Sequence, residues 1–91
     1  MGIYHRLIMY VGRNLQVVKE SNGSFSVKGD TGISLVSSAF KKEHEAYCPE
    51  EKLAPHVGHE ISCVTYGLGK PVNVSIECED CCEVIFDVDA D

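Results

Sequence analysis

The sequence predicts a small α+β domain that is rich in β-strand, built from antiparallel hairpins with one short helical insertion at about residues 38–54. Two patterns indicate this class. Apolar and polar residues alternate in the first and last thirds of the chain, as they do in half-buried strands. Between these thirds the alternation gives way to a polar stretch with helix-forming residues, which runs on to two closely spaced prolines, Pro49 and Pro55.

The 91 residues are enough for one domain, 1–91, which we divide by pattern into three regions. A chain of this size buries roughly 60–65% of the surface that its unfolded form exposes. Because so small a core supplies little net stability, domains of this size often carry a metal ion or a disulfide. The regions are a β-hairpin region at 1–36, a helical insertion at 37–55 and a metal-binding β segment at 56–91.

The first region predicts a strand and then a hairpin. Residues 8–12 (IMYVG) form a short apolar run that is typical of a strand. A hairpin follows because Asn22-Gly23 is a favoured centre of a type I′ turn. With that turn as the centre, Val18 pairs with Val27 on the largely apolar face of the hairpin. A second turn and a further strand are expected at 29–32 and 33–36.

The helical insertion has recognisable start and stop signals. Ser37 and Ser38 are residues that cap helix amino termini, and the residues that follow favour a short helix. Cys48-Pro49 ends this helix, because the residue before a proline avoids the helical conformation. A proline followed by two glutamates then predicts one more helical turn at 49–53.

The last third predicts three strands. They are expected at 60–66, 71–78 and 83–89, with the first two joined by the glycine-containing link 67–70. Alternation in the last strand assigns Val84, Phe86 and Val88 to one face, and Asp87 and Asp89 to the other.

Between the last two strands lies the pair Cys78-x-x-Cys81, which has the spacing of a zinc knuckle. A knuckle supplies two ligands, whereas structural zinc takes four. His56-Val57-Gly58-His59 repeats the two-residue gap and contains a glycine that permits a tight turn. Cys63, or His44 together with Cys48, are alternative sources of the remaining ligands.

The favoured ligand set is His56, His59, Cys78 and Cys81. Each pair stands at the edge of a predicted β segment, and the two strands between the pairs form a hairpin. Two thiolates and two neutral imidazoles neutralise a divalent zinc ion, so that burial of the cluster leaves no uncompensated charge.

The carboxy-terminal third resembles the zinc-ribbon class of small zinc-binding modules. The residues that carry the resemblance are 76–81 (IECEDC), followed by 83–85 (EVI). The chain departs from the usual pattern in two places: Cys82 occupies a position that is usually glycine, and the first ligand pair is His-His rather than Cys-Cys. The resemblance implies a closed structural zinc site and no particular activity.

The alternative without a metal has histidines on a surface loop and cysteines packed as small apolar side chains. Cys63 alternates with Ile61 on one strand and is expected in the core. Cys48 is expected to be an inert thiol, and Cys82 a packing residue or a spare thiol.

A redox role for Cys78 and Cys81 requires a lowered thiol pKa. The carboxylates around the motif favour the opposite, because like charges raise a thiol pKa. These carboxylates are Glu77, Glu79, Asp80 and Glu83. The motifs of zinc proteases and zinc deaminases are incomplete: His59-Glu60 begins the protease motif, but Cys63 stands where its second histidine is required.

The charge and the cysteine content of the chain limit its expected partners and its expected compartment. The net charge is −6, from fourteen acidic and eight basic residues, which argues against direct nucleic-acid binding. No stretch predicts a signal peptide or a membrane span, and five cysteines, an odd number, suit a reducing compartment. We therefore expect a cytoplasmic protein.

Three functions follow as hypotheses. The first is a small non-catalytic zinc-stabilised module that binds another protein. The second is an acidic inhibitor or mimic, of the type found in phages and mobile elements, that covers a basic nucleic-acid-binding surface of its partner. A clustering of acidic residues on one face would favour it, the residues being Glu43, Glu45, Glu50, Glu51, Asp87, Asp89 and Asp91. The third is a CxxC thiol redox protein.

Overall fold

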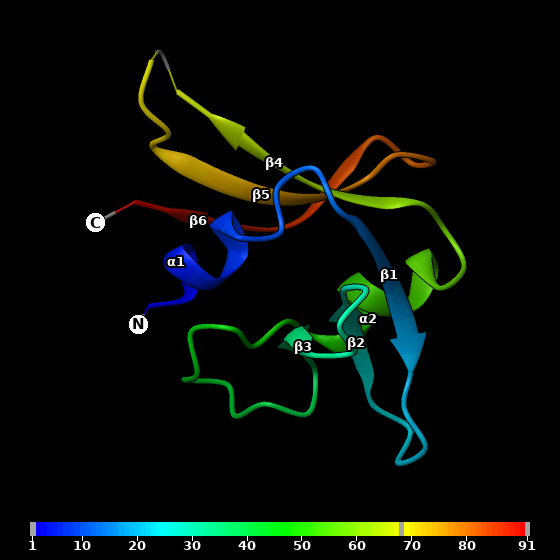
Figure 1. The fold of residues 1–91 in the computed structure, drawn as a ribbon. Coiled ribbons are helices and arrows are strands. Elements are labelled where there is room, and N and C mark those ends of the chain that lie inside the picture. Colours follow the sequence, from blue (N-terminus) through cyan, green and yellow to red (C-terminus); the bar gives the residue numbers. More distant parts are fainter. Residues whose placement is uncertain (1, 68, 91) are drawn as a thin grey trace.

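An antiparallel sheet organises the computed structural model, which describes residues 2–67 and 69–90. Within these ranges the sheet has six strands in the order β3-β2-β1-β4-β5-β6 (Figure 1). The strands are β1 (Asn14–Lys19), β2 (Phe25–Lys28), β3 (Ser34–Ser37), β4 (Ile61–Tyr66), β5 (Asn73–Cys78) and β6 (Glu83–Asp89). The helices are α1 (Ile3–Ile8), α2 (Glu50–Leu53) and the 3₁₀ turn η1 (Ala54–His56). A strand-rich α+β domain with antiparallel hairpins is therefore confirmed.

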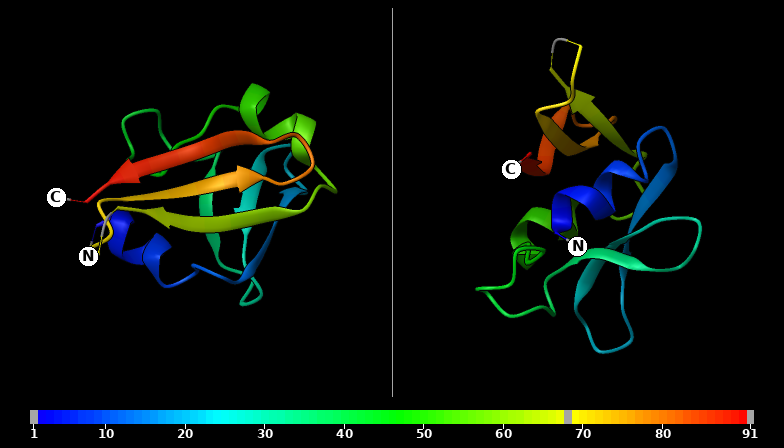
Figure 2. Two further views of the ribbon diagram at one scale, coloured as in Figure 1. Left: turned by 90° about the horizontal axis from the view of Figure 1, so that it is seen from above. Right: turned by 60° about the vertical axis from the view of Figure 1, so that its left-hand side comes forward.

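The sheet curls because its two halves are joined over a short length. β1 pairs with β4 at two positions, Asn14↔Ser62 and Leu15↔Ile61, whereas β4 and β5 pair over six. In the right view of Figure 2 the half formed by β4, β5 and β6 lies across from the half formed by β1, β2 and β3, with α1 between them. The buried apolar side chains of both halves and of α1 form one core cluster. Among the described helices, none combines the length and the apolar composition that crossing a membrane requires.

The predicted strand at 8–12 is wrong, because the chain begins with α1 and continues through turns to β1. Ile3, Leu7 and Tyr10 are buried, at spacings of four and three residues that place them on one face of a helical segment. The apolar inner face of the curled sheet is covered by α1, whose Leu7 is completely buried. A run as short as IMYVG does not distinguish a strand from the end of a buried helix.

The predicted helix over about 38–47 is also wrong: this segment consists of turns. The serines expected to cap it bond to the sheet instead, since the Ser38 hydroxyl accepts a hydrogen bond from Phe25 N in β2. Backbone bonds from Ser37 N to Ala46 O and from Cys48 N to Ser37 O close the segment into a loop. Serine side chains compete in this way with helix formation. The helical turn predicted at 49–53 is confirmed as α2.

The hairpin of β1 and β2 is confirmed, but its register differs by one residue from the prediction. Glu20 N bonds to Ser24 O and Gly23 N to Glu20 O, so the loop has three residues rather than two. Gly23 takes a positive φ of 90°, as in a three-residue loop that ends in a left-handed position. Val17, not Val18, therefore pairs with Val27, and both are buried.

The three strands predicted in the last third are confirmed as β4, β5 and β6, while Leu68 of the predicted link 67–70 lies outside the described residues. The facing of β6 needs correction. The register with β5 shifts between Ile76 and Glu77, and this irregularity turns Ile85 into the core while Val84 is 54% exposed. Phe86 and Val88 pack against the core as expected.

Replacement of Leu7 by alanine tests the role of α1. We expect Leu7→Ala to lower the free energy of unfolding by about 2–5 kcal/mol, because it leaves a cavity where the helix meets the sheet. The measurement is urea unfolding followed by circular dichroism. Met9→Ala is the matched control, since Met9 follows the same helix and is 65% exposed. Equal, small losses in both variants would show that α1 is not part of the core.

Candidate metal centre

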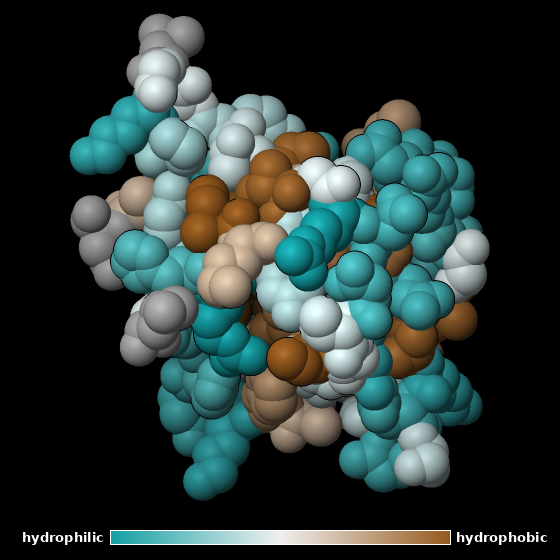
Figure 3. All heavy atoms as spheres, viewed as in Figure 1, coloured by the Kyte–Doolittle hydropathy of each residue, from teal (hydrophilic) through white to brown (hydrophobic). Residues whose placement is uncertain are grey.

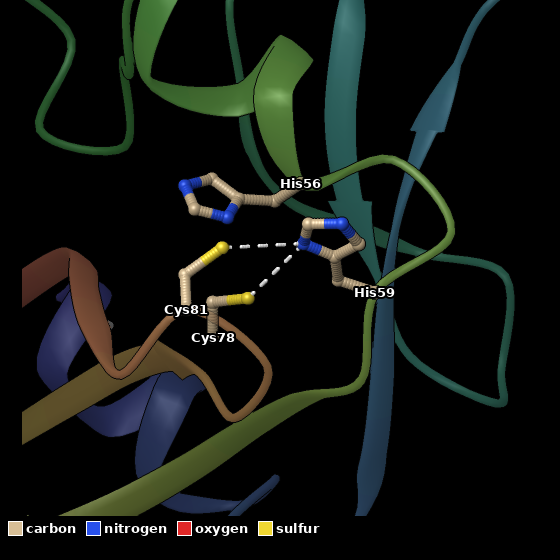
Figure 4. A group of neighbouring side chains, drawn as sticks. All are labelled: His56, His59, Cys78 and Cys81. Atoms are coloured by element: carbon tan, nitrogen blue, oxygen red, sulfur yellow. Dashed lines mark hydrogen bonds between the residues drawn. The ribbon is translucent and has the colours of Figure 1, made fainter.

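Four side chains that are distant in sequence come together at one end of β5 (Figure 4). They are His56, His59, Cys78 and Cys81, the set favoured from the sequence. One ligand atom from each lies within 4.8 Å of all the others. The Nδ1 atom of His59 lies 3.4 Å from the Cys78 sulfur and 3.5 Å from the Cys81 sulfur. The group is positioned to hold a metal ion.

A tight turn positions the two histidines. His56 ends η1, and a hydrogen bond from His59 N to His56 O closes the turn after it. Val57 has φ −61° and ψ 127°, and Gly58 has φ 84°, as in a type II turn, in which the third residue needs a positive φ. Gly58 therefore lets both imidazoles reach the same point. A β-bridge between Val57 and Val17 fixes the turn to β1.

A second turn positions the two cysteines. Cys78 is the last residue of β5, and a hydrogen bond from Cys82 N to Cys78 O closes the loop that leads into β6. Cys82 has a positive φ of 58°, which costs free energy for any residue with a side chain. The glycine usual in zinc-ribbon knuckles would adopt this φ without strain. The unusual Cys82 thus occupies the strained position of the loop.

Backbone contacts hold the two turns together. Ile61, at the start of β4, pairs with Cys78, at the end of β5. Beyond this pair, at the end of the hairpin where the two turns lie, Glu79 N donates to Glu60 O at 2.9 Å, and Glu60 N donates to the Asp80 carboxylate at 3.1 Å. The histidine turn therefore lies beside the cysteine turn by virtue of the β4–β5 pairing.

The distances between the ligand atoms, and a buried histidine nitrogen without a hydrogen-bond partner, fit a tetrahedrally coordinated ion. With Zn–S of about 2.3 Å and Zn–N of about 2.0 Å, a sulfur and a nitrogen ligand lie about 3.5 Å apart, close to the separations of His59 from the two sulfurs. His56 is 4% exposed, and its Nδ1 is buried without a hydrogen-bond partner. In Figure 4 a nitrogen of this ring points toward the sulfurs. A buried nitrogen of this kind needs a partner, and an ion between the four side chains would supply one.

Glu83 is a further residue of the site that the sequence reasoning missed. Its carboxylate lies 3.4 Å from Nε2 of His56. A carboxylate at this distance favours the proton on Nε2 and leaves the lone pair of Nδ1 free for a metal ion. From the sequence Glu83 is one of several acids around the knuckle. Its place directly opposite Cys78 in the β5–β6 pairing distinguishes it.

The electrostatics disfavour a reactive thiolate. The pKa of Cys81 is raised, first by desolvation, then by its hydrogen bond to Cys78 and the charges of Cys78, Glu83 and Asp80. A bound cation is what would deprotonate such thiols. Figure 3 shows a hydrophilic surface over the loop between β5 and β6, where these acids lie.

The alternative ligands lie elsewhere. Cys63 is buried, donates from its sulfur to Leu7 O at 3.3 Å, and has a pKa raised to about 11 by burial, so it is a core thiol as expected. Cys48 is buried and its sulfur donates to Ile85 O, and burial raises its pKa. The Nδ1 of His44 accepts a hydrogen bond from Ala46 N inside the loop.

Replacement of Cys82 tests the strain in the cysteine turn. We expect Cys82→Gly to raise the free energy of unfolding by up to about 1 kcal/mol, because glycine tolerates the positive φ. Cys82→Val should lower it, since β-branched residues tolerate this conformation least. Urea unfolding of the two variants measures both effects. A Cys82→Val variant as stable as Cys82→Gly would contradict the strained loop.

The chain was compared with protein-family models, with curated proteins and with solved structures, and none of them matches it.

Proposed function

We propose that the chain is a non-catalytic protein-binding module whose fold is stabilised by one zinc ion bound to His56, His59, Cys78 and Cys81. The observation that carries this proposal is the convergence of the four ligand atoms within 4.8 Å, with the buried Nδ1 of His56 among them lacking a hydrogen-bond partner. Each pair of ligands comes from a tight turn, as in zinc-binding knuckles.

The ligand chemistry favours zinc. Two sulfur and two imidazole ligands in a compact group are typical of structural zinc sites, whereas magnesium and calcium take oxygen ligands. Two thiolates also balance the charge of a divalent ion, which matters because Cys78 and His56 are buried. The zinc-ribbon resemblance of residues 76–81 and 83–85 supports the same assignment.

A structural role follows from the number of ligands. Catalytic zinc sites have three protein ligands and keep a position open for water, whereas four protein ligands close the coordination shell. The ion would tie the turn before β4 to the turn after β5, and so clamp the end of the sheet. A domain with so small a core gains much from such a clamp. Because a closed site leaves no reacting position, the function belongs to the surface, and we infer a protein partner.

The redox alternative has less support. A thiol with a raised pKa is a weak nucleophile at neutral pH, and the pKa of Cys81 is raised by desolvation, by its hydrogen bond to Cys78 and by the neighbouring charges. The loop after Cys81 leads into a strand, so no helix amino terminus lowers the thiol pKa from that side.

Metal content tests the proposal. We expect about one zinc per chain in tag-free protein purified without chelator, and its loss in His56→Ala and Cys81→Ser. Both variants should unfold at markedly lower urea concentration, because binding free energy is part of the folding free energy. Atomic emission spectroscopy and urea unfolding are the measurements.

Cys82→Ser is the matched control, since Cys82 is a neighbouring exposed cysteine outside the ligand group. It should keep both the zinc and the stability. A folded parent protein without metal, or equal and mild effects of all three substitutions, would refute the zinc site.

Replacement of Glu83 tests its support of His56. We expect Glu83→Ala to weaken zinc binding about tenfold, because the carboxylate that orients His56 is lost. Competition with a chromogenic chelator measures the affinity. Asp87→Ala removes the same charge from the same strand, at a position that pairs with Ser75 and lies outside the ligand group, and should bind zinc like the parent. Equal losses in both variants would assign the effect to net charge instead of orientation.

A further inference from the structure

The half-sheet of β4, β5 and β6 has one face in the core and one face turned outward. Figure 2, in its left view, shows this outer face with no other described segment in front of it. Because residues paired across antiparallel strands share a face, the pairing defines three rows of outward side chains. The rows are Ser62–Glu77–Val84, Val64–Ser75–Asp87 and Tyr66–Asn73–Asp89. We call these nine residues the outer face.

The outer face is acidic. It carries three carboxylates and no lysine or arginine. Asn73 holds two of them in place, since its amide nitrogen donates to Asp87 at 3.1 Å and to Asp89 at 2.8 Å. The carboxylate of Glu79, in the turn that follows β5, accepts a hydrogen bond from Ser62 of the outer face. The three carboxylates of the outer face, those of Glu77, Asp87 and Asp89, therefore lie on strands, and Asn73 holds two of them.

The charge of the chain is concentrated in the same region. Residues 56–91 carry eight acidic residues and a single lysine, whereas residues 1–55 carry six acidic and seven basic residues. The net charge of −6 thus originates in the part of the chain that forms the metal centre and the outer face. That lysine, Lys70, lies between β4 and β5, outside the three rows.

Tyr66 adds an aromatic surface to this face. Its side chain is exposed, and its hydroxyl donates to the Glu77 carboxylate. The hydrogen bond to Glu77, followed by desolvation and the charges of Glu77 and Glu79, raises the pKa of Tyr66, as a negative environment does. An exposed aromatic ring among carboxylates is the combination that binds arginine and lysine side chains, through ion pairs and cation–π contact.

Ser75 occupies the centre of the middle row. It is 1% exposed, and its hydroxyl is buried without a hydrogen-bond partner. Its cross-strand neighbours on the face are Val64 and Asp87. Buried polar groups are rarely left without partners. A cationic donor bound at Asp87 would bring hydrogen-bonding groups to this position.

We propose that the outer face binds a lysine- and arginine-rich segment of a partner protein. The partner chemistry follows from charge complementarity, because a sheet face with fixed carboxylates and an exposed tyrosine attracts a basic chain and repels nucleic acid. This inference deepens the proposed function by assigning the partner-binding surface, and it does not depend on the identity of the metal. The proposed binding surface is formed by β4, β5 and β6 alone. It does not include the acidic residues of loop 38–48 and α2, which are Glu43, Glu45, Glu50 and Glu51.

Nuclear magnetic resonance can locate the binding. The isotope-labelled protein, as purified, is titrated with a short synthetic peptide of alternating arginine and serine. We expect the largest amide shifts in the nine residues of the outer face. Two controls, a peptide of alternating glutamate and serine and a short DNA duplex, should cause no amide shifts in these residues. Shifts centred on loop 38–48 or α2, shifts spread evenly over the surface, or equal binding of DNA would overturn the proposal.

Charge-matched variants make the test sharper. Asp87→Asn with Asp89→Asn should weaken peptide binding about tenfold, because two fixed charges are lost. Glu43→Gln with Glu45→Gln removes two exposed charges from loop 38–48 and should change binding less than twofold. Equal losses in the two double variants would show that net charge, and not the outer face, binds the peptide.

The metal measurement keeps the two proposals apart. Both double variants should retain the zinc content of the parent protein, because none of the four substituted residues belongs to the ligand group. A parent without zinc that still binds the peptide at the outer face would refute the metal centre alone. A zinc-containing parent that does not bind the peptide would refute the outer-face proposal alone.

Discussion

The antiparallel pairing of β4 with β5 is the constraint on which the rest of the structure depends. Ile61 and Cys78 are opposite each other, so the residues before β4 and the residues after β5 must meet at one end of the hairpin. The histidines lie just before β4, and the cysteines lie at the last residue of β5 and just after it, so the pairing sets the distance between the two ligand pairs. The same pairing orients the inner face toward α1 and the outer face toward solvent. A slip by one residue would exchange the two faces and separate the ligands.

The candidate site was predictable from the sequence because each of its two ligand pairs lies within one short turn. Each ligand pair comes from one turn, which spacing and a glycine indicate, and the intervening hairpin follows from alternation. Glu83 was not distinguishable, because its contact with His56 depends on the β5–β6 register. The irregularity in that register also hid the burial of Ile85. The strand pairing determines which of several acidic residues contacts a given histidine, and the composition of the segment does not.

The fold was predictable where strands alternate and unpredictable where tertiary contacts override local preference. β4, β5 and β6 stand where the pattern puts them. The segment 8–12 and the serines at 37 and 38 were misread for the same reason: each satisfies a need elsewhere in the structure. The curled sheet needs an apolar filling, which Leu7 and the rest of α1 provide. The backbone N–H of Phe25, at the start of β2, needs a hydrogen-bond acceptor, which the Ser38 hydroxyl provides. Neither need is visible within a short window of sequence.

The metal centre and the outer face share one strand, and this links their energetics. Cys78 and Glu77 are consecutive residues of β5, so their side chains lie on opposite sides of the sheet, one toward the ligand group and one on the outer face. An ion bound to the candidate ligands would clamp the end of β5 to the turn before β4, and so would restrict the rows in which Glu77, Ser75 and Asn73 are placed. A binding face on a rigid sheet loses less conformational entropy when a partner docks than a face on mobile strands. If the proposed ion is bound, it would therefore contribute to recognition of the proposed partner without touching it, because it would keep the carboxylates in position before binding.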